Sequence, residues 1–120
     1  MEKLFKLNES PYHEVNAIRV SVHYYKRAGG YAVQAELLHY YFDGDLKGLF
    51  SKCFCPEYYN HDGDGISKVF EAGRRSAKKE AEAAAYCEAN AADIAHRFLQ
   101  HVIAKLGIEK DIHIIGEAEA

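Results

Sequence analysis

Alternation of apolar and polar side chains marks two consecutive strands near the start of the chain. From residue 18 to 24, branched or aromatic side chains occupy every even position and polar ones every odd position. A period of two with β-branched residues is typical of a half-buried strand. Gly29 and Gly30 then supply a turn, and residues 31–37 alternate again. The pattern predicts a β-hairpin over residues 17–38.

The pattern beyond the hairpin is less regular but still favours strands. Residues 46–55 are rich in leucine, phenylalanine and cysteine and end before Pro56, so we expect a third strand there. Residues 67–72 predict a fourth short strand, and residues 111–115 suit a last one. Residues 1–7 fit an edge strand or a helical turn equally well.

One long helix, from about residue 76 to 105, is indicated by apolar residues at spacings of three and four. The positions on this face are Ala81, Ala84, Cys87, Ala91, Ile94, Phe98 and Val102. Alanines fill its first half, and small side chains let a helix lie close to a sheet. The sequence therefore predicts an α+β fold, in which an antiparallel sheet of three to four strands packs against one long C-terminal helix.

Length and composition indicate a single domain. The chain has 120 residues, of which 48% are hydrophobic, enough for a core. We expect flexible ends at about residues 1–12 and 116–120. No apolar run approaches the roughly 18 residues of a membrane span. The start of the chain has no signal-peptide pattern, and three cysteines give no even disulfide framework, so a cytoplasmic location is expected.

The start of the long helix carries an unusual charge pattern. Four basic residues, Arg74, Arg75, Lys78 and Lys79, stand within six positions. A helix N-terminus already favours anions, and cations there are locally unfavourable for the helix. The net charge of -3 argues against phosphate binding by the whole surface but permits a local basic patch. Phosphate binding would explain the cations.

The stretch from Arg74 to Ala85, after three strands, resembles the second helix of double-stranded-RNA-binding domains. The resemblance covers residues 74–85 and a generic β-β-β-α order; that family's first helix has no counterpart here. It implies that Lys78 and Lys79 contact phosphates, assisted by Arg74 and Arg75, without reading base sequence. The alternative is that these side chains only solvate an alanine-rich helix, with Glu82 as an ion-pair partner.

A second pattern, in residues 60–71, resembles an EF-hand calcium loop. Asn60, Asp62, Asp64 and Glu71 stand at ligand positions one, three, five and twelve, with glycine at six. Pro56 interrupts the place of the entering helix. A Gly/Asp-rich turn between strands is therefore the competing interpretation.

Cysteines and histidines provide no recognisable catalytic motif. Cys53, Cys55, His61 and Cys87 lack the usual spacing of zinc ligands, and buried small side chains are the simpler interpretation. His23 and His39 could face each other across the hairpin. We expect a non-enzymatic protein without a cofactor.

Aromatic residues suggest self-association as the rival function. If Tyr25, His39 and Tyr41 share the outer face of the sheet, a second copy of the chain could cover them. The leading hypothesis is a small module that binds double-stranded RNA or DNA. The alternative is a protein-interaction or homodimerisation module, and a calcium-binding domain is third.

Overall fold

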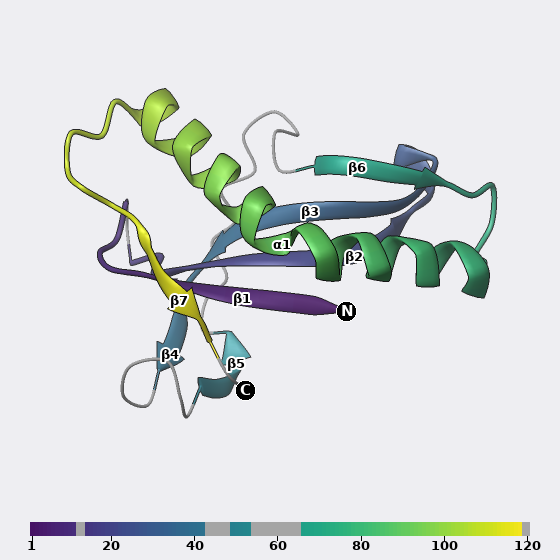
Figure 1. The fold of residues 1–120 in the computed structure, drawn as a ribbon, viewed down its shortest axis with the longest axis horizontal. Helices are drawn as coiled ribbons and strands as arrows, with labels where there is room; N and C mark the ends of the chain where they lie inside the picture. Colours follow the sequence, from purple (N-terminus) through teal and green to yellow (C-terminus); the bar gives the residue numbers. More distant parts are fainter. Residues whose placement is uncertain (12–13, 43–48, 54–65, 119–120) are drawn as a thin grey trace.

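Five antiparallel strands form the main sheet of the computed structural model, which describes residues 1–11, 14–42, 49–53 and 66–118 (Figure 1). The strands are β1 (Glu2–Leu7), β2 (Ala17–Tyr25), β3 (Gly30–Leu38), β6 (Ile66–Glu71) and β7 (Ile114–Glu117). Their spatial order is β6-β3-β2-β1-β7. The long helix, α1 (Ala77–Leu106), lies across one face of this sheet (Figure 1). The α+β prediction is confirmed.

The sheet is wider than predicted because both ends of the chain join it. β1 pairs with β2 on one side and with β7 on the other. Residues 2–7 and 114–117, expected in part as flexible ends, are thus strands of the sheet. The predicted third strand exists as β5 (Leu49–Cys53), but it pairs with β4 (Tyr40–Phe42) in a separate two-stranded sheet.

The hairpin follows the predicted alternation. β2 and β3 pair from Ala17↔Leu38 to Tyr25↔Gly30, and the 3-10 turn η1 (Lys26–Ala28) joins them. Even positions of β2 and odd positions of β3 face α1, where Ile18 and Leu37 are fully buried. Odd positions of β2 lie on the opposite, outer face of the sheet. The period of two fixes which residues meet the helix.

The helix is capped at both ends by residues suited to that role. The Ser76 hydroxyl accepts a hydrogen bond from the Lys79 N–H at 3.3 Å, and Gly107 ends α1 in the left-handed conformation with φ 64°. The buried face consists of Ala83, Cys87, Ala91, Ile94, Ala95, Phe98, Leu99 and Val102. Most of the predicted face is therefore confirmed, but Ala81 is exposed and Ala83 takes the core position.

Among the described residues, no helix combines the length and the apolar character that crossing a membrane requires.

Candidate nucleic-acid interface

The β2–β3 turn and the start of α1 lie at the same end of the molecule. β6 runs antiparallel to β3, so its last residue, Glu71, pairs with Gly30 at the beginning of β3. The Ala72 N–H then donates a hydrogen bond to the Gly29 carbonyl at 2.9 Å. The chain passes from there through residues 73–76 into the helix. Two segments about 45 residues apart are thus held together by backbone hydrogen bonds.

This contact needs glycine at position 30. A Cβ atom built on Gly30 would lie 2.1 Å from the Phe70 carbonyl oxygen and 2.7 Å from the Ala72 nitrogen. Both partners are backbone atoms, which cannot move aside as a flexible side chain would. The absent side chain therefore allows the hairpin and the end of β6 to approach each other.

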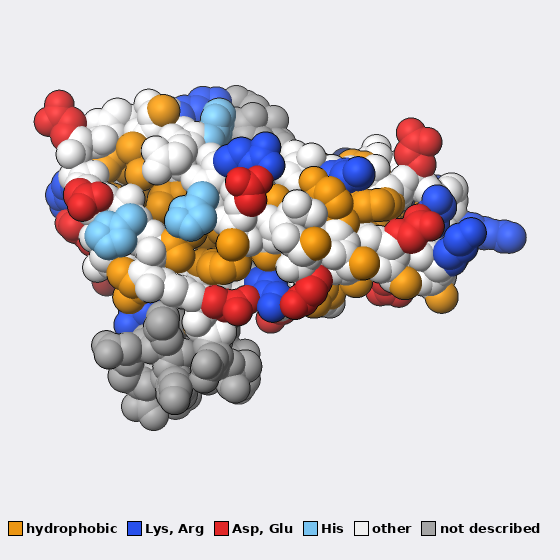
Figure 2. Space-filling model, in the orientation of Figure 1, with side chains coloured by type: hydrophobic (Ala, Val, Ile, Leu, Met, Phe, Trp, Pro, Cys, Tyr) orange, Lys and Arg blue, Asp and Glu red, His pale blue; other side chains and the backbone are white. Residues whose placement is uncertain are grey.

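The junction gathers six cations at one end of the protein, which we call the basic end. Its members are Lys26, Arg27, Arg74, Arg75, Lys78 and Lys79. Segments 26–29 and 71–82 contain these six basic residues and three acidic ones, an excess of three positive charges. The rest of the chain has nine basic and fifteen acidic residues. Figure 2 shows Lys and Arg side chains projecting where the helix begins.

Two tyrosines on the helix-facing side of the sheet hold the helix start in place. The Ser76 N–H donates to the Tyr31 hydroxyl at 2.9 Å, and the Tyr24 hydroxyl donates to the Ala72 carbonyl at 3.4 Å. The two rings meet edge to face with centroids 5.0 Å apart. The Arg75 guanidinium lies over the Tyr24 ring, 5.0 Å from its centroid. These contacts fix the segment that carries the cations.

The cations differ in how much they are engaged within the protein. Lys79 is half-buried and forms an ion pair at 3.2 Å with Glu82, the partner that the solvated-helix interpretation expects. The cations at 26, 27, 74 and 78 are exposed and form no ion pair within the described part of the chain. Four positive charges are therefore available to an external anion.

The sequence identified four of the six cations as a site but not Lys26 and Arg27. These two stood in a predicted turn, and only the pairing of β3 with β6 brings them beside the helix. The sequence could have indicated this contact. In a meander of three antiparallel strands, the end of the third strand lies beside the turn between the first two, which here carries Lys26 and Arg27.

The calcium-loop pattern stays a prediction, because most of its residues lie outside the described structure. Asn60, Asp62 and Asp64 of the calcium-loop pattern lie outside the described residues, and Glu71 is exposed at the end of β6. No group of three or more metal-ligating side chains occurs among the residues that are described.

Of the four residues weighed and set aside as zinc ligands, only Cys87 has a described side chain, since those of Cys53, Cys55 and His61 lie outside that part. Cys87 is fully buried on the sheet-facing side of α1, and its burial raises the pKa of the thiol. A buried neutral thiol of this kind behaves as a small apolar group.

The outer face of the sheet carries a polar cluster. The Arg19 guanidinium donates to a Glu36 carboxylate oxygen at 2.6 Å, and the Gln34 amide donates to the same carboxylate. Burial alone would lower the pKa of Arg19, but the hydrogen bond and the charge of Glu36 raise it by more. Arg19 therefore stays charged on this face.

The aromatic residues predicted to share the outer face are only partly together. Tyr25 is 39% exposed and its ring lies 5.9 Å from that of His23. His39 follows the far end of β3, so it does not face His23, which pairs with Ala32. The ring of His39 is hydrogen-bonded to the Glu14 carbonyl at 2.6 Å. The side chain of Tyr41 lies outside the described structure.

Neither a family model, nor a curated protein, nor a solved structure matches this chain. The similarity of residues 74–85 to double-stranded-RNA-binding domains stays a prediction.

Proposed function

We propose that the protein is a non-enzymatic module whose basic end binds the phosphate backbone of double-stranded nucleic acid. The observation that carries the proposal is the junction of the β2–β3 turn with the helix start. Cations from two segments form one surface there. A duplex presents regularly spaced phosphates, so a surface with several fixed cations can contact more than one of them.

The surroundings of the cations support phosphate as the ligand. The exposed Arg74 and Lys78 stand at the end of α1 where the helix dipole disfavours positive charge. An anion bound there would remove this penalty and would also meet free backbone N–H groups. Tyr24 and Tyr31 fix the helix start before any ligand arrives, which lowers the ordering entropy that binding costs.

The chemistry of the basic end also limits what it recognises. Lysine and arginine contacts to phosphates position a protein on a duplex and carry no base information. We therefore expect binding that depends strongly on salt and weakly on sequence. RNA and DNA duplexes would differ through groove shape and the 2′-hydroxyl groups rather than through bases.

The test is fluorescence anisotropy with a labelled duplex over a range of salt concentrations. If four to six phosphate contacts form, log K falls against log salt with a slope of about -4 to -5. Lys78→Glu with Lys79→Glu should abolish binding at moderate salt. The matched control, Lys105→Glu with Lys110→Glu, changes the net charge equally at the other end of α1 and should retain most of the affinity. Equal losses in both double variants would contradict the proposal.

Self-association is the second candidate, and exposure of Tyr25 on the outer face of the sheet supports it. A homodimer through this face buries Tyr25, which directly precedes Lys26, so dimerisation would also cover part of the basic end. Light scattering would then give twice the mass of 13.5 kDa, and Tyr25→Lys would restore the monomer. A monomeric mass at all accessible concentrations would rule out this candidate.

A further inference from the structure

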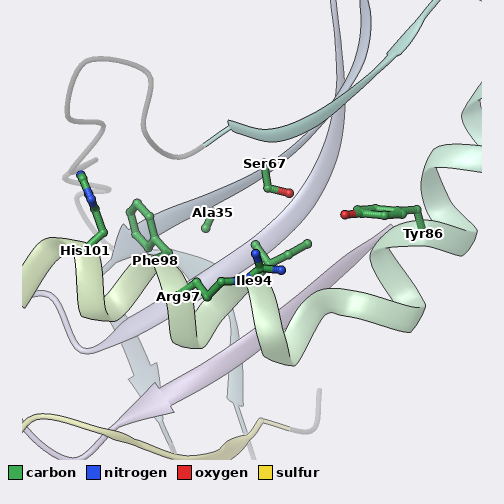
Figure 3. A pocket seen from close by; sticks show the side chains of 7 residues that line it. All are labelled: Ala35, Ser67, Tyr86, Ile94, Arg97, Phe98 and His101. Carbon is green, nitrogen blue, oxygen red and sulfur yellow. The ribbon is translucent and has the colours of Figure 1, made fainter.

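A pocket lies between α1 and strands β3 and β6, away from the basic end (Figure 3). Its volume is about 300 Å³. Ile94, Phe98 and Ala35 form its apolar lining, and Ser67, Tyr86 and Arg97 add polar groups. A few polar groups over an apolar surface are typical of small-molecule sites, which start at about this volume.

The polar groups come from two elements and face a common space. Ser67 belongs to β6, whereas Tyr86 and Arg97 belong to α1. In Figure 3 the hydroxyl groups of Ser67 and Tyr86 point toward each other, and the Arg97 side chain extends along the helix over Ile94 toward them. Two hydroxyl donors and a guanidinium can together bind the oxygens of one anionic group.

Charges around the pocket favour an anion. The Lys68 ammonium lies 4.7 Å from the centroid of the ring of Tyr86, which lines the pocket. Arg97 forms an ion pair with Asp93, one turn earlier on the helix. A guanidinium has five N–H donors, so the bond to Asp93 leaves donors for a ligand. Among these described side chains, the cations Lys68 and Arg97 outnumber the carboxylate of Asp93.

The apolar part of the pocket determines what the uncharged part of a ligand must be. Ile94 and Phe98 are at least 95% buried side chains of the core, so their surfaces lining the pocket do not move freely. At roughly 30 Å³ for each atom, the volume of a liquid water, the pocket holds about ten non-hydrogen atoms. We propose that it binds a small amphipathic anion, with a carboxylate or phosphate at Arg97 and an aromatic or branched body against Phe98.

The experiment is a ¹⁵N–¹H NMR titration of the full chain with phenylacetate, phenyl phosphate and neutral phenylacetamide. For a ligand of this size we expect a Kd of about 1 mM, with saturating shifts at Ser67, Tyr86 and Arg97. Phenylacetamide, which has the same shape without the charge, should bind at least about tenfold more weakly. Either anion saturating at this site supports the proposal, and the tighter one identifies the preferred head group.

Two variants make the result decisive. Arg97→Gln should weaken binding of the anions about tenfold, since it removes a charged donor from an exposed helix position without touching the core. Lys78→Gln, the same charge change near the start of the same helix, should leave Kd unchanged. Absence of saturable shifts at about 10 mM ligand, ten times the expected Kd, would overturn the proposal, as would equal binding by phenylacetamide or by the Arg97 variant. Duplex binding at the basic end should not respond to Arg97→Gln, so the two proposals fail separately.

Discussion

Replacing Gly30 with alanine tests whether close backbone approach holds the basic end together. The new Cβ would stand 2.1 Å from the Phe70 oxygen and 2.7 Å from the Ala72 nitrogen, distances that real Cβ atoms essentially never show. β3 and the end of β6 would have to separate by roughly 1 Å to restore ordinary contact distances. That movement strains the pairing of Gly30 with Glu71 and the hydrogen bond from Ala72 to Gly29.

The expected cost follows from these contacts. Loss of one or two backbone hydrogen bonds contributes about 1 kcal/mol each, and residual overpacking adds about 1 kcal/mol or more. We therefore expect Gly30→Ala to lower the free energy of unfolding by about 3 kcal/mol. For a domain of this size, that lowers Tm by about 12 °C.

Gly73→Ala is the matched control, because it makes the same substitution in the neighbouring loop. A Cβ at Gly73 would meet no atom within 4 Å, so its Tm should stay within about 4 °C of the wild type. Thermal and urea unfolding monitored by circular dichroism measure both variants. Equal stability of the two would refute the inference that the glycine at position 30 allows this contact.

Three further predictions test how the helix is anchored and packed on the sheet. Tyr31→Phe removes the acceptor of the Ser76 N–H, so the free energy of unfolding in urea should fall by about 1 kcal/mol and duplex binding should weaken. Unchanged stability and affinity would mean that this hydrogen bond does not hold the helix start. Ala83→Leu should lower the free energy of unfolding by about 1–3 kcal/mol through overpacking, whereas Ala81→Leu at an exposed position should lower it by less than about 0.5 kcal/mol. The opposite ranking would show that Ala83 is not on the buried face of the helix. The raised pKa of Cys87 means that the folded chain keeps a proton that the unfolded chain loses, so stability falls above the unfolded-state pKa as pH rises. Between pH 8 and 10 the wild type should lose more stability than Cys87→Ala, by up to about 1.4 kcal/mol for each pH unit, and parallel curves would contradict the burial of the thiol.

The elements with a clear period were predictable from sequence. Alternation over residues 18–24 identified β2 and its buried face, because a period of two leaves one choice of face once the apolar side is known. The helix predicted at about residues 76 to 105 is found as α1, which Ser76 and Gly107 cap in the structure. Such local signals need no knowledge of the rest of the chain.

The phase of the first helical turns was not predictable in the same way. Residues 81–85 are alanine at every position except Glu82, so alanine stands on several sides of the helix and gives no apolar direction. From Cys87, a step of four residues toward the N-terminus reaches Ala83, which is buried. Steps of three from Cys87 reach Ala84 and then Ala81, which are more exposed.

Long-range pairing accounts for what the sequence left open. β1 lies between β2 and β7 although more than 100 residues separate it from β7, and the hexapeptide of β1 has no strict alternation. The addition of Lys26 and Arg27 to the candidate site likewise depends on the pairing of β3 with β6. Charge clusters in sequence thus give part of a surface, and strand topology gives the rest.

The most direct test of the central claim is a ¹⁵N–¹H NMR titration with a short RNA duplex and a DNA duplex of matched sequence. We predict that the amides of residues 26–29 and 73–79 shift together, along one binding curve, and that the shifts fade as salt rises. The difference between the RNA and DNA curves identifies the preferred duplex. Shifts confined to residues 73–79, or no shifts with either duplex at low salt, would contradict the claim that the two segments form one phosphate-binding surface.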